Sequence, residues 1–152
     1  MSVPVVLVVE DGTEYTEAFA RLSGDVGPVE LLRASHAAEA RALLTTRRVD
    51  AVFLDVVFDR TPPELLAGDR DELERRFAGD RSRVLELLAT LQGFYLLAEL
   101  APSISPGVPV LLAQDFSSEP GRLAALRASV PGLDGVAESA TTTQILRRLT
   151  GR

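Results

Sequence analysis

Two short apolar runs that end in acidic residues constrain the fold of this chain more than any other feature. The first run, Val3 to Val9, is rich in valine and is followed directly by Glu10 and Asp11. The second run, Ala51 to Val57, carries Asp55 near its carboxyl end. Runs without polar alternation are typical of strands that are buried on both faces, as in a parallel sheet. We therefore expect a parallel sheet whose carboxyl edge carries acidic residues.

Segments with helical spacing alternate with the apolar runs. Thr13 is the expected cap of the first helix, because a threonine hydroxyl can accept a free backbone N–H at a helix start. Alternating strands and helices imply crossover units with helices on both faces of a parallel sheet. The predicted fold is α/β, a doubly wound five-stranded parallel sheet with the flavodoxin-like order 2-1-3-4-5. Further strands are expected at 29–33, 108–113 and 133–137, and further helices at 35–45, 119–129 and 141–149.

Residues 58–92 interrupt this rhythm. The tetrapeptide Ala-Gly-Asp-Arg occurs at 67–70 and again at 78–81. Glycine often ends a helix and aspartate often caps the next one, so we expect a short helix at about 71–77 and a second helix from Asp80 to Leu100. The chain is then one domain, 1–152, in which 58–92 form a helical insertion and an amino-terminal extension of the third helix. The apolar residues expected to pack this insertion are Leu65, Leu66, Leu73 and Phe77.

Composition excludes several classes of function. The formal charge of −6 disfavours nucleic acids and anionic membranes as partners. The chain has no cysteine, and all 16 of its basic residues are arginine, so thiol and lysine chemistry are excluded. The single histidine, His36, is expected at the surface. The stretch 84–101 is too polar for a membrane span and no secretory leader is evident, so we expect a cytoplasmic protein.

The acidic residues at the two strand ends form the candidate site. Glu10, Asp11 and Asp55 would converge where the strand order reverses, which is where doubly wound folds bind ligands. Three close carboxylates repel one another, and a hard cation such as Mg²⁺ would relieve that repulsion. The alternative is that these are solvated acids at the ends of strands.

Four segments resemble response-regulator receiver domains, in the right order and over nearly the whole chain except 58–92. The resemblance implies that Glu10 and Asp11 bind Mg²⁺, that Asp55 is the phosphoacceptor, and that the backbone carbonyl of Val57 is a further metal ligand. Gly93 resembles the glycine that opens the third helix of the family. The segments are Val-Leu-Val-Val-Glu10-Asp11, Val49-Asp50-Ala-Val-Phe-Leu-Asp55, Gly107-Val-Pro109-Val-Leu-Leu and Gly132-Leu-Asp134-Gly135.

Three positions depart from the family pattern. The family has Ser or Thr where this chain has Gln114, an aromatic residue where it has Val136, and lysine where it has Ser139. In the family, the hydroxyl and ammonium groups hold the phosphoryl oxygens, and the movement of the hydroxyl reports phosphorylation to the far face. The acidic half of the site is therefore kept and the switch half is degenerate, which resembles atypical or pseudo-receiver domains.

Other chemistries match less well. A haloacid-dehalogenase-type phosphatase needs a second acid where this chain has Val57, and a flavin phosphate would be repelled by Glu10 and Asp11. The arginines of the insertion leave two interpretations open. They either form a solvated helix face paired with neighbouring acids, or one of them reaches over the acidic pocket and replaces the missing lysine. These arginines are Arg60, Arg70, Arg75, Arg76, Arg81 and Arg83.

The resemblance implies a stand-alone receiver-like domain of bacterial type in phosphorelay signalling, which acts through protein contacts and is not an enzyme. Mg²⁺, bound weakly, is the expected cofactor. Its partner would be a histidine kinase, a phosphotransfer protein or a downstream effector, with no nucleic acid or membrane involved. A homodimer through the fourth helix, fifth strand and fifth helix is left open. The alternative function is a phosphorylation-independent pseudo-receiver that serves as a protein interaction module.

Overall fold

Five parallel strands form one sheet in the computed structural model, which describes residues 2–152. The strand order is β2-β1-β3-β4-β5, as predicted. One row of paired apolar residues crosses the whole sheet, from Leu32 through Leu7, Val52 and Val110 to Leu133. The strands are β1 (Val5–Val9), β2 (Glu30–Ala34), β3 (Ala51–Leu54), β4 (Val110–Leu112) and β5 (Leu133–Asp134).

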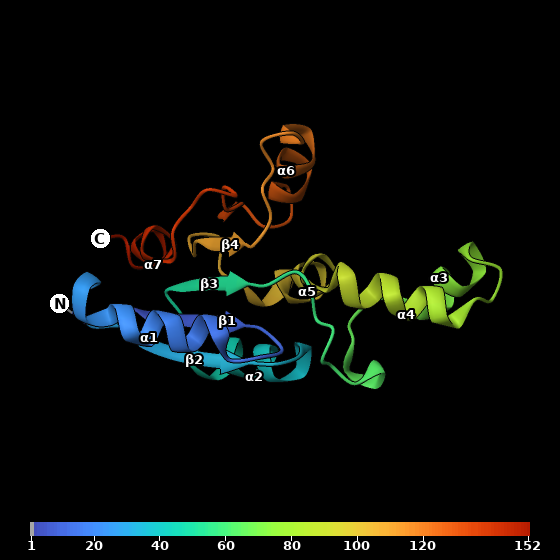
Figure 1. The fold of residues 1–152 in the computed structure, drawn as a ribbon, viewed down its shortest axis with the longest axis horizontal. Helices are drawn as coiled ribbons and strands as arrows, with labels where there is room; N and C mark the ends of the chain where they lie inside the picture. The colour runs from blue at the N-terminus through green and yellow to red at the C-terminus, as the bar shows by residue number, and fades with distance from the viewer. Residues whose placement is uncertain (1) are drawn as a thin grey trace.

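Helices cover both faces of this sheet (Figure 1). On one face, Phe53 of β3 packs with Phe19 and Leu146 from the two helices that lie there. On the other face, Leu54 and Leu112 pack with Leu96. The first face carries α1 (Glu14–Val26) and α7 (Thr142–Thr150), and the second carries α2 (Ala37–Thr46), α5 (Gln92–Leu100) and α6 (Pro120–Arg127).

The insertion after β3 is ordered and helical. Asp69 caps α3 by accepting the N–H of Glu72 at 3.1 Å, and Asp80 caps α4 by accepting the N–H of Arg83 at 3.1 Å. Both Gly-Asp signals in the sequence therefore mark helix starts. We call α3 and α4 together, residues 70–90, the arm; it projects from the sheet end towards the right of Figure 1. The elements are the 3₁₀ turn η1 (Pro63–Leu65), α3 (Arg70–Arg76) and α4 (Arg81–Thr90), with a further 3₁₀ turn, η2 (Ala101–Ser103), after α5.

The prediction of one continuous helix from Asp80 to Leu100 is wrong, because the helix breaks at Leu91. The two parts, α4 and α5 with η2, are bent by 74°. The cause is the attachment of α5 to the end of β3, where the N–H of Gly93 donates to the carbonyl of Val56 at 3.0 Å. A Cβ at Gly93 would lie only 2.4 Å from the carbonyl oxygen of Asp55, so the approach requires glycine.

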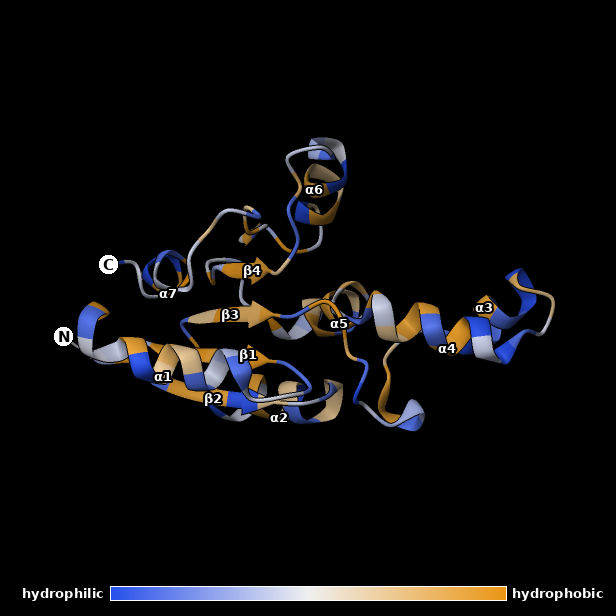
Figure 2. Cartoon of the chain, in the orientation of Figure 1, coloured by the Kyte–Doolittle hydropathy of each residue, from blue (hydrophilic) through white to orange (hydrophobic). Residues whose placement is uncertain are grey.

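The apolar residues of the insertion divide into buried and exposed ones. Leu66 and Leu73 are buried in the same core cluster as the sheet, as predicted, and Phe77 packs against that cluster. Leu65 was expected to be inward but is 40% exposed, because the η1 turn directs it to solvent. Figure 2 shows that the arm carries both apolar and hydrophilic residues, whereas β3 and β4 are mainly apolar.

The helices of residues 2–152 include no single helix that is long and apolar enough to cross a membrane. The bent pair of α4 and α5 with η2 reaches the necessary length and hydropathy only when its two parts are taken together.

Candidate functional site

Asp55 is the first residue after β3 and lies beside the end of β1. Its N–H donates to the carbonyl of Val9 at 3.0 Å, which joins the carboxyl ends of the two strands. One carboxylate oxygen of Asp55 accepts the N–H of Val56 at 2.9 Å. Because Glu10 and Asp11 directly follow Val9, this backbone hydrogen bond places all three acids at the same edge of the sheet.

Glu10 is held by the start of α1. Its side chain is almost fully buried, and its Oε1 accepts the N–H of Tyr15 at 3.1 Å. Its Oε2 accepts the N–H of Thr16 at 2.8 Å and the hydroxyl of Thr16 at 2.7 Å. A carboxylate at this position satisfies free N–H groups and lies favourably at the positive end of the helix. Thr13 occupies the N-cap position of α1 as predicted, but its hydroxyl donates to Glu17 and accepts no backbone N–H.

Asp11 is covered by Arg60 from the insertion. The N–H of Arg60 donates to Asp11 Oδ2 at 2.7 Å, and its guanidinium donates to Glu14 Oε1 at 2.7 Å. The Asp11 side chain is only 4% exposed. One arginine of the insertion therefore reaches the acidic pocket, where it pairs with Asp11 and Glu14. That it takes the place of the missing lysine stays a prediction. Arg81, by contrast, pairs with Glu74 of the arm at 3.4 Å.

The pocket has an excess of negative charge around Asp55. Burial raises the pKa of Asp55 above its ordinary value, and the nearby charges of Asp11, Glu10 and Glu14 raise it further against the opposing hydrogen bond from Val56. Burial also raises the pKa of Tyr15, with added contributions from Asp55 and Glu10. An ionised Asp55 is therefore favoured by any cation that enters the pocket.

The donor atoms at this edge fit a hard cation, although they are not arranged around one. Residues 2–152 contain no group of three His, Asp or Glu side chains placed to hold a metal ion. Both oxygens of Glu10 are held by α1, which leaves the carboxylates of Asp11 and Asp55 and the backbone carbonyl of Val57. Carboxylate and carbonyl oxygens are the ligands that Mg²⁺ takes in proteins, with water completing its shell.

Two of the three residues that depart from the family pattern in the sequence analysis lie together. Gln114 and Val136 line a hollow of about 360 Å³ together with Tyr15 and Glu138. The N–H of Val136 donates to the carbonyl of Gln114 at 2.9 Å, which joins the chain after β4 to the chain after β5. Ser139 is exposed and is not among the residues that line this hollow.

Asp115 is a structural residue of the site that the sequence reasoning missed. Its carboxylate accepts the N–H of Ser117 at 2.8 Å and the N–H of Glu138 at 2.9 Å. These hydrogen bonds, that from Glu138 first, lower the pKa of Asp115. The contact with Ser117 could have been inferred from the Asp-Phe-Ser sequence, because aspartate often bonds the backbone two residues on. No local signal indicates the contact with Glu138.

Solved structures with the same arrangement identify the fold. CheY4 of Vibrio cholerae, crystallised at pH 4.0, matches with a TM-score of 0.59 and 17% identity over 97% of both chains. A CheY-like receiver domain protein of Methanospirillum hungatei matches with a TM-score of 0.58 and 12% identity, over 99% of this chain and 93% of that one. This chain has the receiver fold.

Another example is the receiver domain of the Francisella response regulator 1452, with a TM-score of 0.59 and 16% identity over 96% of this chain and 93% of that one. Neither the protein-family models nor the curated proteins give a match to this sequence. In the receiver fold of this chain, Asp55 stands at the carboxyl end of the central β3, and α5 begins against it at Gly93.

Proposed function

We propose that this chain is a receiver-like signalling domain in a phosphorelay, with Asp55 as its phosphoacceptor. The observation that carries the proposal is the position of Asp55, directly after the central strand of a receiver fold and hydrogen-bonded through its N–H to the end of β1. In doubly wound folds this crevice, at the point where the strand order reverses, is where ligands bind.

The reaction would be phosphoryl transfer to the Asp55 carboxylate. One carboxylate oxygen attacks the phosphorus atom of the donor, the bond from phosphorus to the leaving group breaks, and an acyl phosphate forms on Asp55. Asp11, Asp55 and the Val57 carbonyl would hold Mg²⁺, which would neutralise charge on the phosphoryl oxygens. Glu10 would keep α1 and the loop that carries Asp11 in place, rather than serve as a free ligand.

The partners would be proteins. A histidine kinase or a phosphotransfer protein would supply the phosphoryl group, and a downstream effector would read the state of the domain. The domain would be a cytoplasmic signalling module of bacterial type rather than an enzyme, and it would bind neither nucleic acid nor membranes. The face formed by α6, β5 and α7 is the candidate surface for a homodimer.

A second candidate function is a pseudo-receiver that works without phosphorylation. The observation that favours it is the tie from Asp115 to Glu138, which fixes the loops beside Gln114 and Val136. Phosphorylation could not move those loops without breaking that tie. In this case Asp55 would accept no phosphoryl group.

Mass spectrometry of the intact protein distinguishes the two functions. We expect the wild type to gain the mass of one phosphoryl group on incubation with acetyl phosphate and Mg²⁺, and to gain nothing when EDTA is present. Asp55→Asn should gain nothing in either case. Asp59→Asn is the matched control, because Asp59 has a 75% exposed side chain and should behave as wild type. Absence of any gain in the wild type would leave the pseudo-receiver function.

A further inference from the structure

A segment of the insertion passes over the acidic pocket and is anchored at both ends. We call residues 58–66 the strap. At its start, Phe58 is 1% exposed and its N–H donates to the carbonyl of Ala89 at 2.8 Å. At its end, Leu66 is buried. The next residue, Ala67, forms hydrogen bonds to the side chain of Gln92 through both its N–H and its carbonyl. Both anchors therefore lie at the corner between α4 and α5.

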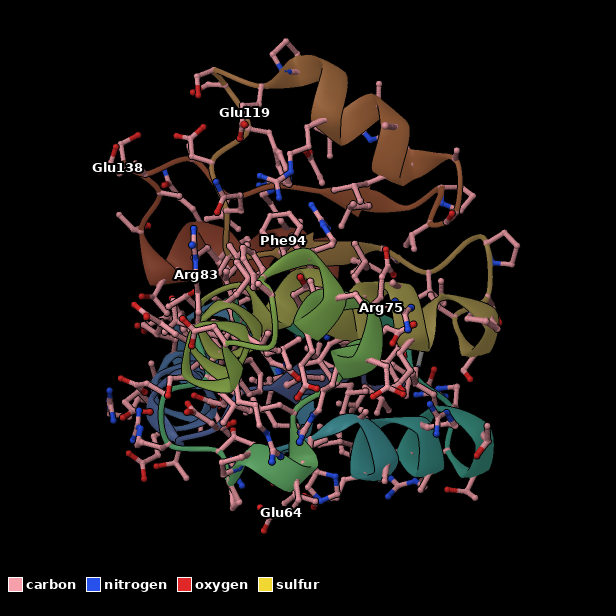
Figure 3. The ribbon with its side chains drawn as sticks, turned by 90° about the vertical axis from the view of Figure 1, so that its right-hand side faces the viewer. Glu64, Arg75, Arg83, Phe94, Glu119 and Glu138 are labelled. Carbon is pink, nitrogen blue, oxygen red and sulfur yellow. The ribbon has the colours of Figure 1, made fainter. Side chains whose placement is uncertain are left out.

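Most residues in the middle of the strap are exposed, although Thr61 is half-buried, and Arg60 donates hydrogen bonds to Asp11 and Glu14 of the body. Figure 3 looks onto this end of the molecule and places Glu64 of the strap at one edge, with Glu119 and Glu138 on the opposite side. The arm, marked by Arg75 and Arg83, lies between them. Glu138 also lines the hollow that contains Gln114 and Val136, so the strap and this hollow lie on opposite sides of this end of the molecule.

Arg60 covers Asp11 closely. Besides the hydrogen bond from its N–H to Asp11 Oδ2, its Nε lies 3.9 Å from Asp11 Oδ1. A Cβ on Gly12 would lie 2.7 Å from both terminal nitrogens of the guanidinium, so the guanidinium rests directly on the loop after β1. Arg33 supports the same loop from the other side, where its Nε donates to the carbonyl of Gly12 at 2.5 Å.

The strength of these contacts differs along the strap. The side chain of Arg60 is 58% exposed, and exposed ion pairs contribute little to stability because water screens them. The anchors, in contrast, are the buried side chains of Phe58 and Leu66 and the buried hydrogen bonds between Gln92 and Ala67. The centre of the strap can therefore leave the pocket while its ends stay fixed.

We infer that the strap is a cover that a divalent cation displaces, with Arg60 and the cation as alternative counter-charges for Asp11. This inference rests on the proposed function, since it concerns the same acidic pocket. Of the two carboxylate oxygens of Asp11, Oδ2 accepts the N–H of Arg60 and Oδ1 lies 3.9 Å from its Nε, so a cation on either oxygen meets the positive guanidinium at close range. The cation and the guanidinium therefore oppose each other at Asp11. By linkage, whatever holds the strap on Asp11 weakens cation binding by the same factor.

The experiment uses the full chain and the variant Arg60→Gln, which removes the guanidinium but keeps a polar side chain. Mg²⁺ is titrated while the amide signals of Asp11, Gly12 and Asp55 are followed by NMR. We expect Arg60→Gln to bind Mg²⁺ roughly fivefold more tightly than wild type, as the loss of one exposed competing charge implies. Arg81→Gln makes the same change of charge on the arm and should bind as wild type.

Hydrogen exchange gives a second readout in the wild type. Saturating Mg²⁺ should speed the exchange of the Arg60 amide, whose acceptor is Asp11, while the amides of Phe58 and Ala67 stay protected. Equal Mg²⁺ affinity in wild type and Arg60→Gln would overturn the inference, and so would the absence of Mg²⁺ binding in both. If Arg60→Gln instead left Mg²⁺ affinity unchanged and shortened the life of the phosphorylated state, Arg60 would hold the phosphoryl group and the cover would be refuted.

These outcomes are separate from the test of the proposed function. Failure of acetyl phosphate to modify Asp55, together with tighter Mg²⁺ binding by Arg60→Gln, would reject phosphorylation and keep the displaceable cover. Modification of Asp55 with equal Mg²⁺ affinity in both proteins would support phosphorylation and reject the displaceable cover.

Discussion

The carboxylate of Asp115 accepts the backbone N–H of Glu138 at 2.9 Å and thereby ties the loop after β4 to the loop after β5. The same carboxylate accepts the N–H of Ser117, so one side chain holds both the loop that leads into α6 and the loop after β5. These loops flank the hollow that contains Gln114 and Val136. The tie therefore fixes the shape of this hollow.

Asp115→Asn should lower the stability of the protein at neutral pH. The hydrogen bonds lower the pKa of Asp115 in the folded state, so its ionised form contributes stability above its ordinary pKa, and this contribution is lost as the pH falls through the lowered value. The difference in unfolding midpoint between wild type and variant should thus be present at pH 7 and shrink at acidic pH. A difference that grew at low pH would contradict this assignment.

Asp55→Asn should have the opposite effect in metal-free buffer. Burial raises the pKa of Asp55, so ionising it costs the folded state stability as the pH rises through the raised value. The variant should therefore unfold at a higher temperature than wild type at pH 7. The gain should disappear once the pH falls below the ordinary pKa of aspartate, where the carboxyl is protonated in both states. Thermal unfolding from pH 3 to 8 measures this.

Gly93→Ala should destabilise the protein by about 1–3 kcal/mol, the usual range for overpacking a tight site. The added methyl group would meet the carbonyl oxygen of Asp55 at 2.4 Å and push α5 away from β3. Gly24→Ala is the matched control, since Gly24 lies within α1 and a Cβ added there would have no neighbour within 4 Å. It should stabilise the protein by about 0.5–1 kcal/mol. Urea unfolding of both variants provides the comparison.

Gln92→Leu should cost about 2 kcal/mol or more of unfolding free energy. The Gln92 side chain accepts the N–H of Ala67 at 2.7 Å and donates to the carbonyls of Ala67 and Leu88 at 3.1 and 2.9 Å. Leucine fills a similar volume but leaves these buried groups without partners. Leu65→Ala, at an exposed position of the insertion, should stay within about 0.5 kcal/mol of wild type. An equal loss in both variants would show that the hydrogen bonds of Gln92 do not stabilise the corner between α4 and α5.

Sequence reasoning succeeded where the signal is local. The apolar runs predicted the five strands, although β3 ends at Leu54 rather than Val57. The strand order, which the structure confirms, came from the doubly wound pattern and not from the runs themselves. Asp69 and Asp80 were found as caps because a cap and its helix are adjacent in the chain. The capping role of Glu10 was missed, because its carboxylate reaches residues five and six positions ahead, beyond the usual spacing of a cap.

The break at Leu91 and the contact of Arg60 with Asp11 could not be predicted in the same way. Residues 81–100 contain no proline, and Gly93, although it resembles the glycine that opens the family's third helix, is also compatible with a helix that extends through it. The break depends on where Gly93 meets β3. Asp11 and Arg60 are 49 positions apart. Six arginines of the insertion had the same chemistry, and only the fold distinguishes Arg60 from the other five.

The position of the insertion has a consequence for the order in which the chain folds. The strands β1, β2 and β3 lie within residues 5–54 and can pair as soon as that part has been synthesised. Strand β4 pairs with β3 only after residues 55–109 have followed, and doubling the length of a connection adds only about 0.6 kcal/mol to its closure. Pulse-labelled refolding should therefore protect the amides of β1 before those of β4, and halving the connection by removing the arm should shorten the delay between them by no more than about threefold, the rate equivalent of that closure cost.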